Sequence, residues 1–71
     1  MSKDVRRVVG TNVRRARKSA GLTQAALAEK MDVDRAYVSG LERGERNPTI
    51  VTLWHVAQAL KAKVYSFFEG V

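Results

Sequence analysis

The chain has 71 residues, of which 45% are hydrophobic and 28% charged, as expected for one small globular domain. It has no cysteine and a single histidine, His55, which excludes a disulfide framework and a cysteine- or histidine-based metal site. Thirteen Lys and Arg against seven Asp and Glu give a net charge of +6, which favours a polyanionic partner. No stretch approaches the ~18 apolar residues of a membrane span, and the N-terminus lacks the apolar region of a signal peptide. We therefore expect a cytoplasmic protein without a membrane partner.

The first predicted helix runs from about Asp4 to Ala20, where Gly21 ends it because glycine adopts the left-handed conformation most easily. At 100° per residue, its apolar side chains fall on one arc. They are Val5, Val9, Val13, Ala16 and Ala20. The opposite side carries a basic stripe of Lys3, Arg7, Arg14 and Lys18. Such a stripe is compatible both with a solvated face and with contacts to phosphates.

Four further helices are predicted, and no stretch alternates as a strand would. Thr23 and Asp34 are expected to cap two short helices that end near residues 31 and 43, with a turn at 32–34 between them. Thr49, after the only proline, caps a helix that extends to about Leu60. A last short helix over 64–69 buries its apolar side chains or presents some of them to a partner. The inward positions of the other helices are Leu27, Ala28, Met31, Val33, Val38, Leu41, Leu53, Val56, Ala57 and Leu60. The apolar side chains of the last helix are Val64, Phe67 and Phe68.

The segment from Thr23 to Gly44 has the pattern of a helix-turn-helix, two short helices joined by a tight turn. In its second helix, Val38 and Leu41 point to one side. The opposite arc combines arginines with very small side chains: Arg35, Ala36, Ser39, Gly40 and Arg43, with Tyr37 at the border. Small residues allow the backbone close to base edges, and arginine fits O6 and N7 of guanine. This arc is therefore predicted to enter a DNA groove.

A resemblance to a known family rests on the stretch LTQAALAEKMDVDRAYVSGLERG, preceded by NVRRARKSAG and followed by ERNPT. These residues resemble the Cro/phage-repressor (XRE-type) helix-turn-helix family. Within that family, DRAYVSGLERGERN is most similar to the small controller proteins of restriction–modification systems. The resemblance implies an all-α, compact five-helix, lambda-repressor-like domain over residues 1–71, with the motif at about 23–43. It also implies a regulator that binds double-stranded operator DNA as a homodimer.

Roles for individual residues follow from the same resemblance. Arg35 matches the position of direct base reading, and Gln24 matches a glutamine that touches phosphate and helps to fix recognition-helix residues. Arg43 and Arg46 match positions that hold the DNA backbone. Two readings stay open for several other candidates at the DNA surface. Thr23 either contacts phosphate or only caps its helix, and Tyr37 either packs as a border aromatic or reaches the phosphate backbone or a distorted base step. Asn47 either contacts the DNA backbone or serves as a turn residue before proline. Ala36 offers only an apolar contact, and Ser39 faces the groove with Gly40.

Glu42 needs a separate explanation, because a carboxylate on a DNA-facing helix repels phosphate. In the family this glutamate pairs with an arginine near the end of the first helix, and Arg17 occupies the matching position. The resemblance therefore implies a largely buried, structural ion pair between Arg17 and Glu42.

A single domain of this size contacts few base pairs, whereas two copies related by a twofold axis read half-sites one helical turn apart. The dimer-interface candidates lie late in the chain. They are Ile50, Trp54, Val64, Tyr65 and Phe68, with His55 at the rim and Phe67 assigned to the core.

Two other classes of function were weighed against a DNA-binding regulator. An enzyme is excluded because no paired carboxylates, catalytic triad or glycine-rich phosphate loop is present, and no cofactor or small-molecule ligand is expected. An antitoxin-like protein–protein module on the same fold is disfavoured, because such a surface has little use for Arg35, Arg43 and Arg46 together. The sequence leaves open repression or activation, and a restriction–modification, prophage or chromosomal locus. Autoregulation is compatible with all of these.

Overall fold

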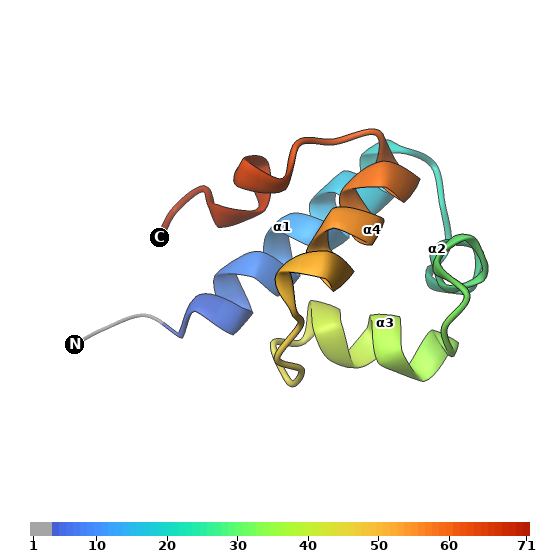
Figure 1. Cartoon of the computed structure of the whole chain (residues 1–71), viewed down its shortest axis with the longest axis horizontal. Helices are drawn as coiled ribbons and strands as arrows, with labels where there is room; N and C mark the ends of the chain where they lie inside the picture. The colour runs from blue at the N-terminus through green and yellow to red at the C-terminus, as the bar shows by residue number, and fades with distance from the viewer. Residues whose placement is uncertain (1–3) are drawn as a thin grey trace.

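The computed structural model describes residues 4–71, so that Lys3 of the predicted basic stripe lies outside the described residues. The regular elements are α1 (Val5–Ser19), α2 (Gln24–Met31), α3 (Arg35–Glu42), α4 (Ile50–Leu60) and the short 3-10 helix η1 (Val64–Phe68). The predicted all-α class is confirmed, although the fifth helix is 3-10 rather than α. In Figure 1, α3 lies along the edge of the domain opposite the connection from α4 to η1. None of the helices in this part of the chain has the length and apolarity needed to cross a membrane.

Threonine caps begin two of the helices. The Thr23 hydroxyl accepts a hydrogen bond from the Ala26 N–H at 3.0 Å, and the Thr49 hydroxyl accepts one from the Thr52 N–H at 3.0 Å. Asp34 occupies the N-cap position of α3, but its carboxylate accepts no bond from the helix. The predicted position of the cap is therefore confirmed, but its side chain makes no capping hydrogen bond. Its backbone carbonyl instead takes the Tyr37 N–H at 3.0 Å.

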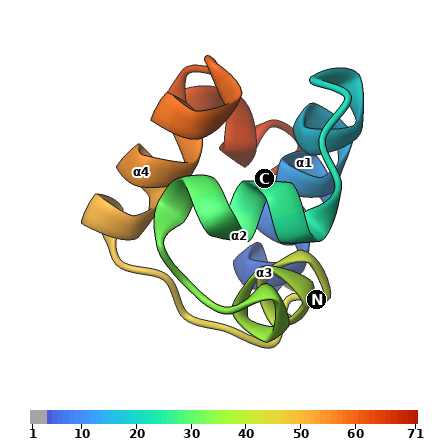
Figure 2. The same ribbon diagram turned by 90° about the vertical axis from the view of Figure 1, so that its right-hand side faces the viewer.

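The turn between α2 and α3 depends on a left-handed residue. Asp32 has φ 58°, and the following Val33 N–H donates to the Ala28 carbonyl at 3.0 Å. This closes α2 with a Schellman-type cap and reverses the chain within three residues. The tight turn sets α3 across α2, as the end-on view in Figure 2 shows.

The core lies where the four α-helices and η1 converge. Phe67, Leu27 and Leu41 are its largest fully enclosed side chains, and burial of each stabilises the fold by about 2 kcal/mol. The inward positions predicted for α4 are all buried. Two predicted core positions are more open than expected. Val5 and Ala20 are exposed because they lie at the two ends of α1. Phe68, at the end of η1, is partly exposed, in line with the alternative that the last helix presents some of its apolar side chains.

A buried asparagine attaches the C-terminal segment to α1. The Asn12 amide donates to the Phe67 carbonyl at 2.8 Å and to the Glu69 carbonyl at 2.9 Å. Arg15 donates in turn to the Asn12 side-chain oxygen at 3.0 Å. These bonds satisfy carbonyls that a 3-10 helix of five residues leaves without partners, and they hold η1 against α1.

Close approach of α1 to the end of α3 requires a glycine in the middle of α1. A Cβ at Gly10 would collide with the Leu41 carbonyl oxygen and would lie 2.8 Å from the Glu42 carbonyl oxygen. Both obstacles are backbone atoms, so neither can move aside without shifting a helix. Gly10 therefore sets the distance between α1 and α3.

We expect Gly10→Ala to destabilise the domain by about 1–2 kcal/mol. Overpacking against two backbone oxygens costs up to about 3 kcal/mol, and the better helix propensity of alanine offsets about 1 kcal/mol of this. Thermal unfolding should show a melting temperature lower by at least about 4 °C. The matched control is Gly40→Ala, which changes another helical glycine whose new methyl group meets only the flexible Arg46 side chain. A Gly10→Ala melting temperature equal to that of Gly40→Ala would contradict this account.

Candidate nucleic-acid interface

The two sides of α3 differ in how far they are buried. Its inner side, with Val38, Leu41 and Glu42, is buried against the rest of the domain. Its outer side carries Arg35 and Ala36, which are exposed, and Ser39, which is half-buried. In both views α3 lies at an edge of the domain, with no other described helix beyond it (Figures 1 and 2).

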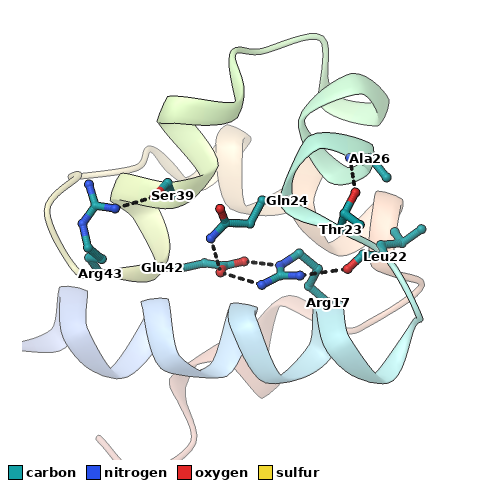
Figure 3. Close-up of polar contacts among 8 residues, drawn as sticks. All are labelled: Arg17, Leu22, Thr23, Gln24, Ala26, Ser39, Glu42 and Arg43. Carbon is teal, nitrogen blue, oxygen red and sulfur yellow. Dashed lines mark hydrogen bonds and ion pairs between the residues drawn. The ribbon is translucent and has the colours of Figure 1, made fainter.

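A buried ion pair ties the inner side of α3 to α1. Arg17 Nε lies 2.6 Å from Glu42 Oε2, and Arg17 Nη2 lies 3.0 Å from Glu42 Oε1. The two side chains are 9% and 3% exposed, so the pair is almost wholly removed from water. Arg17 Nη1 also donates to the Leu22 carbonyl at 2.8 Å, which ties the α1–α2 connection to the same guanidinium (Figure 3). This fork-to-fork geometry is the strongest form of an arginine–carboxylate contact. The hydrogen bonds that Arg17 donates to the Glu42 carboxylate raise the pKa of Arg17 further above its already high value.

Gln24 extends this network to the surface. As the first residue of α2, it donates its side-chain N–H to Glu42 Oε1 at 3.0 Å (Figure 3). An amide nitrogen carries two hydrogens, so that one bond to Glu42 leaves the second for another acceptor. Gln24 is half-buried, and its bond to Glu42 joins the start of α2 to the end of α3. The neighbouring Thr23 is exposed, and its hydroxyl oxygen is engaged in capping α2.

Arg43, at the end of α3, is held by two neighbours in the free protein. It donates to the Ser39 hydroxyl and, at 3.0 Å, to the Glu45 carboxylate. The hydrogen bond from Arg43 lowers the pKa of the Glu45 carboxyl, so this carboxyl is ionised at neutral pH. An exposed pair of this kind contributes little to stability and exchanges readily for other partners.

Arg46, in the loop after α3, turns back over the helix. Its guanidinium carbon lies 5.3 Å from the centre of the Tyr37 ring, within range of a cation–π contact. Gly40 was predicted to face the groove, but it is buried, and the nearest atoms to its missing side chain belong to Arg46. This prediction is wrong because the loop brings Arg46 over Gly40. Asn47, the next residue, is exposed.

Part of the basic stripe on α1 continues this surface. Arg7, Thr11 and Arg14 line a shallow groove together with Arg43 and Glu45. The stem of Arg7 also packs beside Gly44, whose positive φ of 76° ends α3. Cations from α1 and from the end of α3 are thus brought to one side of the molecule.

A second surface is apolar and lies on α4 and the C-terminal segment. Ile50 is 80% exposed, Trp54 52% and Tyr65 76%. Phe68 is also partly exposed, whereas Val64 is half-buried against the core. Val51 and Val71 are exposed as well and were missed, because periodicity alone does not separate an exposed apolar residue from a core one.

Comparison with known proteins identifies the fold and the motif. A model of the helix-turn-helix family matches residues 13–65, which is more than half of the chain. The chain belongs to this family. The predicted class of function, a DNA-binding transcriptional regulator of the XRE type, is confirmed at this level.

Three similar proteins illustrate the range of this helix-turn-helix family. An uncharacterized HTH-type transcriptional regulator from Sinorhizobium fredii is 47% identical over 57 residues, which cover 80% of this chain and 74% of the relative. The control protein C.SmaI from Serratia marcescens is 39% identical over 61 residues, covering 86% of this chain and 73% of that protein. The crystal structure of the restriction–modification controller protein C.AhdI from Aeromonas hydrophila superposes with a TM-score of 0.84 at 36% identity. That superposition covers 89% of this chain and 96% of the other.

We expect Glu42→Ala to destabilise the domain by about 3–5 kcal/mol, because the change leaves the Arg17 guanidinium buried without its counter-charge. Urea unfolding monitored by circular dichroism measures this loss. Glu45→Ala is the matched control, since it removes the same charge from an exposed ion pair with Arg43. Its unfolding midpoint should stay close to that of the wild type. If the two variants unfold at the same urea concentration, the buried pair has no structural role.

Proposed function

We propose that the protein is a sequence-specific transcriptional regulator that binds operator DNA as a homodimer, with α3 in the major groove. The observation that carries the proposal is the outer side of α3, where Arg35 and Ala36 are exposed and take no part in packing. The inner side of the same helix is held by the core and the Arg17–Glu42 pair. A rigid helix with a free, arginine-bearing face is the arrangement that reads base edges in the major groove.

Within this proposal, Arg35 reads bases from the N-terminal end of α3. A guanidinium can donate two parallel hydrogen bonds to O6 and N7 of guanine. Ala36 offers an apolar contact to a thymine methyl group, while Tyr37 and Ser39 lie further along the helix. In this arrangement, the side chains of α3 provide most of the recognition of the DNA sequence.

Phosphate contacts are proposed at both ends of the motif. Thr23 and Gln24 lie at the start of α2, whereas Arg43, Arg46 and Asn47 lie at the end of α3 and in the loop after it. Contacts of this kind set the register of the protein on the duplex and make binding salt-dependent. In the free protein, Arg43 is paired with the exposed carboxylate of Glu45. Phosphate would therefore take its place as the partner of Arg43.

A homodimer is proposed through the apolar surface of α4 and the C-terminal segment. Ile50, Trp54 and Tyr65 are mostly exposed in the single chain, and no function in DNA binding is proposed for them. Isologous pairing would bury these side chains and present two copies of α3 to consecutive half-sites. Phe68 and Val64 would contribute at the edge of the same interface.

Similarity to control proteins suggests a biological setting. C.SmaI is named as a control protein and C.AhdI as a restriction–modification controller. Such a regulator would act in the cytoplasm, at nucleoid DNA, through occupancy of its operator. We therefore propose control of a restriction–modification or prophage locus, including its own promoter. The antitoxin-like alternative gains no support from the structure, because no observation ties the exposed arginines of α3 to a protein partner.

We expect Arg35→Ala to weaken binding to a duplex from the region upstream of the gene by about 1–3 kcal/mol, because a bidentate base contact is lost. Fluorescence anisotropy near physiological salt measures this against a scrambled duplex of equal length. The wild type should prefer the upstream duplex by at least about 100-fold. Binding of Arg35→Ala to the scrambled duplex should change much less.

Lys63→Ala is the matched control for charge. It removes one cation from the connection between α4 and η1, on the side of the domain opposite α3 (Figures 1 and 2). It should bind the upstream duplex like the wild type. Equal, weak and steeply salt-dependent binding of both duplexes by the wild type would leave only a non-specific electrostatic interaction and would overturn the proposed function.

We expect Trp54→Glu to shift the protein from dimer to monomer, because a carboxylate in an apolar interface must be desolvated without a partner. Sedimentation velocity at micromolar concentration measures the mass against the 7.9 kDa of one chain. Trp54→Phe is the control at the same position, since it keeps an apolar ring and should remain dimeric. A wild type that sediments as a monomer with and without the upstream duplex would contradict the dimer.

A further inference from the structure

The loop after α3 returns Arg46 to the outer side of that helix through a defined set of backbone bonds. The Gly44 N–H donates to the Leu41 carbonyl at 3.1 Å, and the Glu45 N–H donates to the Gly40 carbonyl at 2.9 Å. Gly44 has φ 76°, which lets the chain reverse at this point. Residue 45 is thus hydrogen-bonded to residue 40, and Arg46 follows directly beside it.

The Arg46 side chain then lies along α3, across Gly40 and toward Tyr37. Gly40 and Tyr37 are three residues apart on the helix and share one face. A Cβ at Gly40 would stand 2.9 Å from Arg46 Nε, 3.3 Å from its Cγ and 3.6 Å from its Cδ. The three nearest atoms therefore all belong to Arg46. At the far end of the side chain, the guanidinium carbon is 5.3 Å from the Tyr37 ring centre.

The position of the Arg46 side chain explains why residue 40 is a glycine, which helix formation alone does not explain. Glycine within a helix is destabilising relative to alanine. Gly40 does not have a positive φ, and the three atoms nearest its missing Cβ all belong to a side chain. The space that it leaves is filled by a flexible arginine that itself remains exposed. Glycine at position 40 thus lowers the stability of the helix relative to alanine, but it leaves room for the Arg46 side chain.

We propose that Gly40 is a positioning residue for DNA binding, because its missing side chain lets Arg46 lie across α3 in the orientation that the duplex meets. The Tyr37 ring contacts the guanidinium group at the far end of the Arg46 side chain. Arg46 is thereby ordered before DNA arrives, and less conformational entropy is lost on binding. The proposal rests on the proposed function, since it assigns Arg46 to the DNA contact.

The test is a double-mutant cycle with Gly40→Ala and Arg46→Ala, measured by anisotropy on the upstream duplex. Each single variant should weaken binding roughly tenfold, because each removes the ordered arginine contact. In the Arg46→Ala background, Gly40→Ala should change the dissociation constant by less than about twofold, the limit of additivity errors. Arg43→Ala is the control background. It removes the same charge from a side chain that is not among the nearest atoms to the Gly40 position, so Gly40→Ala should keep its full cost there.

Two measurements on the free protein separate this proposal from a failure of folding or of the proposed function. Thermal unfolding should show that Gly40→Ala melts at or above the wild-type temperature, because alanine is the better helix former. In NMR spectra, the Arg46 side-chain signals should carry a ring-current shift from Tyr37 in the wild type and lose it in Gly40→Ala.

Three outcomes would overturn the proposal. An unchanged ring-current shift in Gly40→Ala would show that Arg46 does not need the glycine. An undiminished cost of Gly40→Ala in the Arg46→Ala background would show that the new methyl group meets the DNA directly. Wild-type affinity of Gly40→Ala would show that the position of Arg46 has no effect on binding. If the wild type itself fails to prefer the upstream duplex, the proposed function fails, while the shift still tests the geometry.

Discussion

The Arg17–Glu42 pair is the contact on which the arrangement of the motif depends. One guanidinium donates to a carboxylate at the end of α3 and to a carbonyl in the α1–α2 connection. The same carboxylate accepts a hydrogen bond from Gln24 at the start of α2. Helices of eight residues, such as α2 and α3, are too short to be stable alone. Their mutual geometry therefore has to come from tertiary contacts, and this network provides it with directional bonds that apolar packing lacks.

Close packing of α1 against α3 shields the Arg17–Glu42 pair from solvent. Gly10 brings the two backbones together beside the end of α3, and the side chains of the pair remain almost wholly shielded from water. At the other side of α1, Asn12 holds η1 and hence part of the exposed apolar surface. One helix thus positions both the DNA-facing helix and the C-terminal segment. This explains why polar or glycine residues occupy positions of α1 that an ordinary amphipathic helix would fill with leucine or alanine.

Much of the fold could be predicted from the sequence, because apolar spacing, threonine caps and glycine stops report local structure directly. The predicted helix ends agree with those of the structure to within one or two residues, and all of the core positions predicted for α4 are buried. Contacts between distant segments could not be read in the same way. The amide bonds of Asn12 to residues 67 and 69, and the return of Arg46 over Gly40, join residues whose proximity depends on the tertiary fold. A glycine inside an otherwise good helix, as at positions 10 and 40, was the available signal for close approach.

The inner side of α3 is buried in the domain, whereas its outer side is largely exposed. This difference affects how such proteins can diversify. Arg35 and Ala36 contact no part of the core, so exchanging them leaves the folding of the domain almost untouched. A lineage, or a protein engineer, can therefore retarget the domain by changing a few outward residues while the scaffold stays constant. Arg46 is less free to vary, because its place depends on a glycine in the helix itself. New specificities should accordingly arise first at the N-terminal end of α3.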